Sequence, residues 1–190
     1  MDEQILIKKL KQGDEAAFKE IVGTWQNMVY NTAIGILQNA EDAEDVAQDV
    51  FVQVYESVKN FKAESKFSTW LYRITVSKAL DHLRRKKRKK RFAYIQSLFG
   101  VNNEVIIERP DFQHPGVTLD NKERAAVLFK AIDQLPENQK IAFTLHKLEG
   151  LSYQEISEVM KTSVSSVESL MHRAKNNLKK WLTGHYENEE

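Results

Sequence analysis

The chain has 190 residues, of which 42% are hydrophobic and 29% charged, a composition typical of an ordinary soluble globular protein. It has no cysteine, which excludes disulfides, thiolate metal sites and cysteine nucleophiles. Its amino terminus is acidic, and no apolar run approaches the roughly 20 residues that a membrane helix needs, so we expect a cytoplasmic protein without membrane insertion. The net charge of +1 hides an excess of acidic residues in 1–60 and of basic residues in 61–91. This asymmetry favours one polyanionic partner and one partner of different chemistry.

Proline and glycine divide the chain into two helical parts. Pro110, Pro115, Gly100 and Gly116 all lie within residues 92–118, a segment without a sustained helical stripe. Helical periodicity is strong on both sides of this segment, and strand alternation is weak throughout. We therefore predict an all-α fold of two small helical domains joined by a flexible linker. The domains are residues 1–91 and residues 119–190, the second with a short acidic tail, and the linker is residues 92–118.

The first domain contains an acidic amphipathic segment that begins near Asn39. Its apolar stripe runs through Val46, Val50 and Val54, and the opposite face mixes carboxylates with aromatic and valine side chains. That face has the composition of a surface that docks on another protein. A solvated acidic face with Phe51 in the core fits the spacing equally well.

Residues 61–91 interleave aromatic side chains with lysine and arginine, and every residue from Arg84 to Arg91 is basic. Aromatic rings can replace base stacking and cations neutralise phosphates, so this mixture suits single-stranded or unpairing DNA. Phe67 and Trp70 also fit a helical core stripe, and for each of them the core is the favoured interpretation.

Two short amphipathic segments between Leu151 and Leu182 have the layout of a helix-turn-helix. The first begins at Ser152 with the spacing of a capping box to Glu155, and residues 161–163 form the turn. The second segment has short polar side chains near its start, which suit base edges, and basic side chains further along, which suit phosphates. An αα-hairpin packed on its own domain is the competing interpretation.

The sequence gives no pattern for enzyme chemistry. The histidines lack the spacing of a metal site or a catalytic triad, and no glycine-rich phosphate loop occurs. These histidines are His82, His114, His146, His172 and His185. We therefore expect no catalytic residue, no metal, no cofactor and no small-molecule substrate.

Three strings, in this order, resemble the extracytoplasmic-function group of bacterial sigma factors, the promoter-recognition subunits of RNA polymerase. The string NAEDAEDVAQDVFVQVYES is similar to the polymerase-docking helix of that family, and KFSTWLYRITVSKALDHLRRKKR to its helix for the minus-ten element. LPENQKIAFTLHKLEGLSYQEISEVM, with the helix after it, is similar to the domain for the minus-thirty-five element. The resemblance implies a sigma factor that binds core RNA polymerase and directs promoter-specific initiation.

The resemblance also implies which residues meet each partner. Those implied to contact the β′ clamp helices are Asp45, Gln48, Asp49, Phe51, Val52 and Tyr55. Those implied for the minus-ten element, with one base flipped by the loop before the helix, are Phe61, Lys62, Ser65, Lys66, Phe67, Ser68, Trp70, Arg73, Ser77, Lys78, Asp81, Arg84, Arg85 and Lys86. The minus-thirty-five candidates are Ser163, Ser165, Ser166, Glu168, Ser169, His172, Arg173 and Lys175. The family further implies contact with the β flap of polymerase and an anti-sigma factor.

The chain departs from the family pattern in its recognition segment. Lys161 stands where members often have glycine, and Glu168 and Leu170 replace residues that are often basic. Glu168 either accepts a hydrogen bond from cytosine or caps the helix from Ser165.

A helix-turn-helix regulator that acts without docking on polymerase is the alternative function. It accounts for the second domain, but it leaves the acidic helix and the aromatic and basic segment unexplained.

Overall fold

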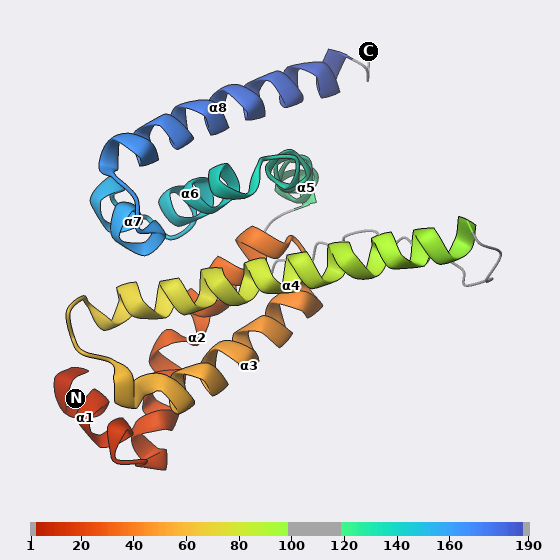
Figure 1. Ribbon diagram of the computed structural model, residues 1–190. Coiled ribbons are helices and arrows are strands. Elements are labelled where there is room, and N and C mark those ends of the chain that lie inside the picture. The colour runs from red at the N-terminus through yellow and green to blue at the C-terminus, as the bar shows by residue number, and fades with distance from the viewer. Residues whose placement is uncertain (1–2, 99–118, 188–190) are drawn as a thin grey trace.

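The computed structural model describes residues 3–98 and 119–187, and every regular element in these ranges is helical (Figure 1), which confirms the all-α prediction. The elements before the gap are α1 (Glu3–Lys11), α2 (Glu15–Leu37), α3 (Ala40–Ser57), the short 3-10 helix η1 (Val58–Asn60) and α4 (Phe67–Leu98). Those after it are α5 (Leu119–Asp133), α6 (Glu137–Lys147), α7 (Tyr153–Met160) and α8 (Val164–Glu187). No helix in the described ranges is long and apolar enough to cross a membrane.

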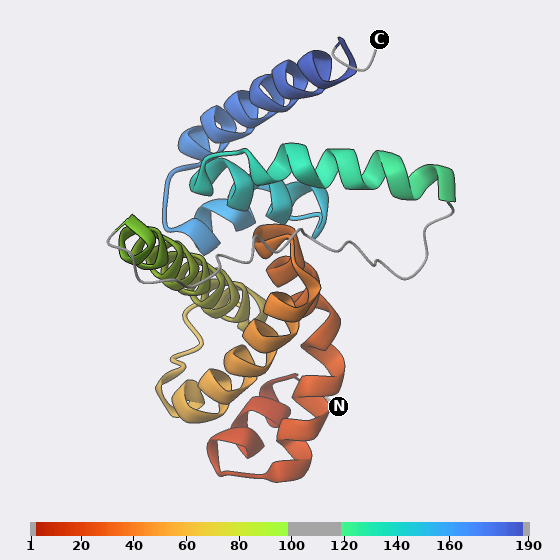
Figure 2. The ribbon, with the colours of Figure 1, turned by 90° about the vertical axis from the view of Figure 1, so that its right-hand side faces the viewer.

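Local capping chemistry sets the boundaries of α2 and α3. The Asp14 carboxylate accepts the backbone N–H groups of Ala16 and Ala17 at the start of α2. The helix ends where Gln38 takes the left-handed conformation, with a φ of 57°. The Asn39 side chain then accepts the N–H of Asp42 at 2.8 Å and starts α3, as its sequence predicts. With such a short connection, α3 folds back along α2 (Figure 2).

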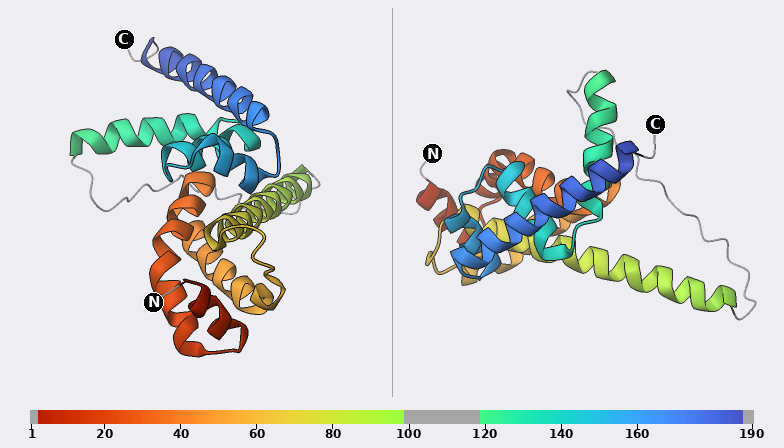
Figure 3. Two further views of the ribbon diagram at one scale, coloured as in Figure 1. Left: turned by 90° about the vertical axis from the view of Figure 1, so that its left-hand side faces the viewer. Right: turned by 90° about the horizontal axis from the view of Figure 1, so that it is seen from above.

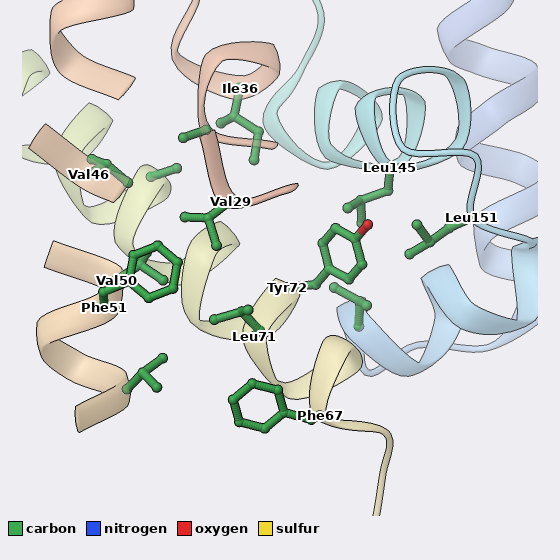
Figure 4. Packing of buried hydrophobic residues seen from close by; sticks show 14 of the residues in the cluster. Val29, Ile36, Val46, Val50, Phe51, Phe67, Leu71, Tyr72, Leu145 and Leu151 are labelled. Atoms are coloured by element: carbon green, nitrogen blue, oxygen red, sulfur yellow. The ribbon is translucent and has the colours of Figure 1, made fainter. Parts of the chain in front are cut away.

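The core of the first helix group lies where α2, α3 and α4 meet. Val46, Val50 and Val54 form the buried stripe of α3, and Leu71 packs against them from α4 (Figure 4). Each side chain of this size stabilises the fold by roughly 1.5–3 kcal/mol when fully buried. These contacts fix the direction of α4, the helix expected to meet DNA. α4 continues through Leu98, past the expected domain end at Arg91, and residues 99–118 of the expected linker lie outside the described residues.

The second helix group is a helix-turn-helix with α5 and α6 packed beside it. Ser152 and Glu155 form the expected capping box at the start of α7. A small separate cluster joins α5 to the second half of α8. Its buried members are Ala131, Ile132, Leu135, Ala174 and Leu178.

The two helix groups pack directly against each other. α7 lies against the first part of α4, and α6 lies against the end of α2 (Figures 1 and 2). One continuous cluster of buried apolar side chains runs through both groups, from Leu71 on α4 to Leu145 on α6 and Ile156 on α7. The second half of α4 extends beyond this contact (Figure 3).

Candidate nucleic-acid and protein interfaces

One face of α3 is acidic and carries exposed apolar side chains. Asp45, Gln48 and Asp49 are exposed on it, and Val52 and Tyr55 remain 56% and 45% exposed. Large apolar groups left in water between carboxylates are typical of a surface that another protein covers. The Tyr55 ring meets the Phe18 ring edge-on, with centroids 5.2 Å apart, which holds it in place. We call these five α3 residues the docking face.

Phe51 lies in the core and is not part of the exposed docking face, although the resemblance implies a clamp contact for it. Its side chain is only 7% exposed and joins the core cluster beside Val50 (Figure 4). The physical reason is helical spacing, because Phe51 flanks the Val46, Val50 and Val54 stripe while Val52 lies on the far side of it. The position of Phe51 agrees with the alternative that puts it in the core, whereas Val52 and Tyr55 leave the docking role of the rest of the face as a proposal.

The aromatic residues before and inside the first turn of α4 form a ring cluster. The Phe61 centroid lies 5.6 Å from that of Phe67 and 5.0 Å from that of Trp70. Phe61 and Phe67 are buried, Phe67 to 1% exposure, which agrees with the favoured interpretation of Phe67 as a core residue. The Lys11 ammonium group donates a hydrogen bond to the backbone carbonyl of Phe61 at 2.6 Å, which holds the start of the loop before α4 in place. Trp70 alone of the three keeps a partly exposed edge.

The remaining minus-ten candidates lie mostly along one side of α4. Lys62, Lys66, Ser77, Asp81, Arg84 and Arg85 are exposed, and Ser65, Ser68, Trp70, Arg73 and Lys78 are half-buried. A groove of about 700 Å³ runs beside this face, with Trp70, Arg73 and Ser77 on one wall and Val159, Met160 and Lys161 on the other. We call the side from Lys66 to Arg85 the strand face.

Lys86 departs from the strand face. Its ammonium group lies 2.7 Å from the Asp42 carboxylate, which also sits 3.0 Å from His82. Asp42 is in the first turn of α3, so Lys86 points toward that helix and is half-buried there. Lys86, which the resemblance includes among the minus-ten candidates, is therefore engaged with α3 in this arrangement.

The minus-thirty-five candidates form a continuous polar surface on α8. Ser163 precedes the helix and accepts the N–H of Ser166 at 3.2 Å, so the cap of α8 is Ser163 rather than Ser165. Glu168 lies beyond the first turn and is exposed, which makes the capping interpretation wrong and leaves its side chain on the outer surface. The exposed members are Ser163, Ser165, Glu168, Ser169, His172, Arg173 and Lys175, and Ser166 is half-buried.

Lys161 occupies the turn of the helix-turn-helix in a left-handed conformation, with φ 51° and ψ 49°. Its N–H bonds the carbonyls at the end of α7, as a glycine would do in this position. For a residue with a Cβ atom this conformation costs roughly 1–2 kcal/mol. The turn therefore holds Lys161 in the left-handed conformation although its side chain disfavours that conformation.

Several residues that the sequence analysis missed connect the strand face to the second helix group. Tyr72 on α4 donates a hydrogen bond to the Glu149 carboxylate at 3.0 Å. Tyr72 is buried and Glu149 is half-buried. Burial raises the pKa of the Glu149 carboxyl, and the bond from Tyr72 lowers it to a smaller extent. Burial and the nearby Glu149 charge raise the pKa of Tyr72. Gly35 and Thr144 make a second contact, and the glycine inside the long apolar segment was the signal that could have revealed it.

Comparison with known proteins identifies the family. Residues 21–89 match the family described as Sigma-70 region 2, and residues 119–178 match Sigma-70, region 4. The chain is 35% identical over 175 residues to the ECF RNA polymerase sigma-E factor of Haemophilus influenzae, covering 92% of each chain. It is 32% identical over 180 residues to the RNA polymerase sigma-H factor of Pseudomonas aeruginosa, covering 95% of this chain and 93% of that one.

The chain belongs to the extracytoplasmic-function group of sigma factors. In this sigma factor the region 2 match includes the docking face and the strand face, and the region 4 match includes most of α8.

Two solved structures share the fold of this sigma factor. CnrH in complex with the cytosolic domain of CnrY superposes with a TM-score of 0.70, at 21% identity, over 96% of this chain and 97% of that one. RpoE of Bartonella quintana, in complex with the anti-sigma factor NepR, superposes with a TM-score of 0.63, at 23% identity, over 87% of this chain and 96% of that one.

Proposed function

We propose that this sigma factor binds core RNA polymerase through the docking face and directs initiation at promoters with a minus-ten and a minus-thirty-five element. The strand face of α4 holds the minus-ten strand, and the outer surface of α8 reads the minus-thirty-five duplex. The first domain extends to Leu98, where α4 ends, and the second begins with α5 at Leu119. The protein works in the cytoplasm, where promoters are, and contributes no catalytic group of its own.

The exposed pair Val52 and Tyr55 carries this proposal. A regulator that binds DNA alone has no need to keep two large apolar side chains in water, 56% and 45% exposed, between acidic residues. A partner that covers them gains apolar burial at the centre and charge complementarity at the rim. For the clamp helices to fill this role, they must present basic side chains around an apolar centre.

The groups on the two DNA-reading surfaces fit their tasks. On the strand face, the partly exposed Trp70 edge lies among Lys66, Arg73 and Lys78, which combines a stacking surface with cations for phosphates. On α8, serine hydroxyls sit in the first turn and Arg173 follows two turns later, so base edges and backbone are within reach of one helix.

Anti-sigma factors are a further proposed partner. The NepR complex and the CnrH complex show proteins of this fold bound by other chains. Sequestration by an anti-sigma protein would suit a sigma factor whose docking face is exposed in the free state.

The test is competition for core polymerase by purified variants. Asp45→Arg reverses the charge of the docking face and is expected to weaken core binding at least about tenfold, because rim charges set both attraction and register. Glu187→Arg makes the same charge change at an exposed position at the end of α8, outside the docking face, and should bind core normally. Both variants should keep the helical circular dichroism of the parent.

Unchanged core binding by Asp45→Arg would reject the docking assignment. The regulator alternative makes the opposite prediction, namely tight binding of promoter duplex without polymerase and no transcription when core is added.

A further inference from the structure

We propose that Glu168 and Val164 set the base sequence that this sigma factor reads in the minus-thirty-five duplex. Glu168 accepts a hydrogen bond from the amino group of a cytosine, and Val164 contacts the methyl group of a thymine about two base pairs away or nearer. This inference rests on the proposed function, because it names the class of sequence that the α8 surface recognises.

Glu168 is an exposed acceptor on the outer surface of α8. The helices α6 and α7 pack against one side of α8 and leave the other side to solvent (Figure 1). The Glu168 side chain is exposed, and it makes no hydrogen bond or ion pair in the part of the chain that the structure describes. Ser163 caps the helix, so the carboxylate is not used there. Both of its oxygens are available to a partner that offers hydrogen-bond donors.

A carboxylate on a helix that binds DNA lowers the general affinity of that helix for DNA. Arg173 and Lys175, which follow Glu168 on α8, attract phosphates, whereas the charge of Glu168 repels them. This repulsion is offset only where a base edge offers the carboxylate a donor. Glu168 therefore discriminates between base pairs, which a contact with the DNA backbone does not do.

The pattern of donors in the major groove selects cytosine for this contact. Cytosine presents its N4 amino group there as a donor, and guanine and thymine present only acceptor atoms, which repel a carboxylate. Adenine presents the N6 amino donor, but its N7 acceptor lies on the same edge and repels the second carboxylate oxygen. A glutamate at this position is therefore best satisfied by cytosine.

Val164 supplies an apolar contact one helical turn earlier. Its side chain is 40% exposed at the first residue of α8, although it is large and apolar. The serine hydroxyls around it bond one another, since Ser163 Oγ lies 3.0 Å from Ser165 Oγ and 2.8 Å from Ser166 Oγ. The apolar group that a base offers in the major groove is the C5-methyl of thymine. Val164 is therefore suited to a thymine.

Helix geometry relates the two bases to each other. Four residues advance an α-helix by about 6 Å, and successive bases of one strand are about 3.4 Å apart along the duplex. Val164 and Glu168 thus reach bases that are separated by about two base pairs or fewer. The proposal predicts one cytosine and one thymine contact within a single short segment.

The experiment uses holoenzyme, reconstituted from core polymerase and the full-length chain, and a pool of barcoded templates randomised at both promoter elements. Sequencing of the transcripts should show that wild type enriches a cytosine at one minus-thirty-five position by about tenfold. Glu168→Gln should change this preference to adenine, because a glutamine amide pairs with both N6 and N7 of adenine. Glu187→Gln makes the same change at an exposed position at the end of α8 and should keep the cytosine.

A second measurement tests Val164 by removing only the methyl group of the enriched thymine. Replacement of that thymine by deoxyuridine should weaken promoter binding by wild-type holoenzyme about fourfold, the value of one buried methyl group. Val164→Ala holoenzyme should bind the two templates equally.

The outcomes separate the two residues from each other and from the proposed function. A wild type without a cytosine preference, or the same cytosine preference in Glu168→Gln, would overturn the role of Glu168. Equal losses on deoxyuridine in wild type and Val164→Ala would overturn the role of Val164. If wild type with core starts transcription on no template of the pool, the proposed function fails instead.

Discussion

The two proposed DNA-reading surfaces of this sigma factor differ in how far their side chains are exposed in the free protein. The α8 surface is built from short polar and charged side chains, and all but Ser166 of its candidates are exposed. The strand face of α4 is built around Trp70 and Arg73, both half-buried, with α7 bonded across it. A surface that stacks on bases needs apolar area, and apolar area is what another helix can cover. The apolar area that lets the strand face stack on bases therefore also lets another helix of the same chain pack on it.

This difference means that the α8 surface is accessible to duplex DNA in the free protein, whereas the strand face is partly covered. The duplex reader on α8 has no described helix packed over its outer surface. The strand face is covered in part by α7, where Arg73 donates to the backbone carbonyl of Glu158. Three predictions test this division, and they are taken in order of the size of the expected effect.

The largest effect is expected at the ring cluster, where a base-stacking role and a core role give opposite results. Phe67→Ala should lower the free energy of unfolding by about 3–5 kcal/mol, because the ring is fully buried and its removal leaves a cavity. Trp70→Ala should cost less stability and should weaken binding of the minus-ten strand by the holoenzyme. Urea unfolding and strand-binding titrations measure the two quantities. If Phe67→Ala keeps the stability of the parent but no longer binds the strand, the core role would be rejected and Phe67 would be a DNA contact.

An intermediate effect is expected on α8. Arg173→Ala should weaken promoter binding by the holoenzyme by about 1–3 kcal/mol, with similar losses on different minus-thirty-five sequences and a salt slope reduced by about 1, the signature of a phosphate contact. Lys147→Ala, an exposed lysine at the end of α6, is the control. A loss confined to one promoter sequence would show that Arg173 reads a base instead.

The smallest effect is a pH dependence of the closed form, in which α7 packs against α4 and Tyr72 bonds to Glu149. The pKa of Glu149 is raised above 4.5 by burial, so the closed form holds this proton more tightly than an open form with a solvated carboxyl. Closure should therefore strengthen as pH falls toward 4.5 and weaken as pH rises through the raised pKa.

Glu155 affects the contact between the helix groups in a different pH range. The pKa of its carboxyl is lowered, first by the Ser152 N–H and hydroxyl and then by Lys66. The stabilisation from its carboxylate is therefore lost only as pH falls below 4.5. Glu149→Gln should remove the dependence above 4.5, measured as strand affinity of the free chain against pH. A dependence that persists in Glu149→Gln would assign it to another group.

Features decided by local chemistry could be predicted from the sequence. The start of α3 at Asn39 and the capping box of Ser152 and Glu155 involve partners three residues apart, so the sequence contains the whole interaction. The order of the three motifs was enough to indicate the family, because each motif is a continuous string.

Features decided by packing could not be predicted in the same way. Spacing places Phe51 at the edge of a stripe, and only the positions of α2 and α4 decide that it is buried. The contact of Gly35 with Thr144 joins residues that are 109 positions apart, and no local pattern specifies such a pair. The cover over the strand face belongs to this second class.

The most direct test of the closed form is the distance between the two helix groups before and after polymerase binds. The chain has no cysteine, so Gln26→Cys on α2 and Lys179→Cys on α8, both exposed, provide unique sites for a dye pair. We expect one narrow transfer-efficiency population in the free protein and a shift to lower efficiency when core polymerase is added without DNA. We expect a similar shift in Gly35→Leu without polymerase, because a Cβ atom at Gly35 would lie 2.5 Å from Thr144 Cγ2 of the second helix group. A free wild-type protein that already shows the polymerase-bound efficiency would contradict the account.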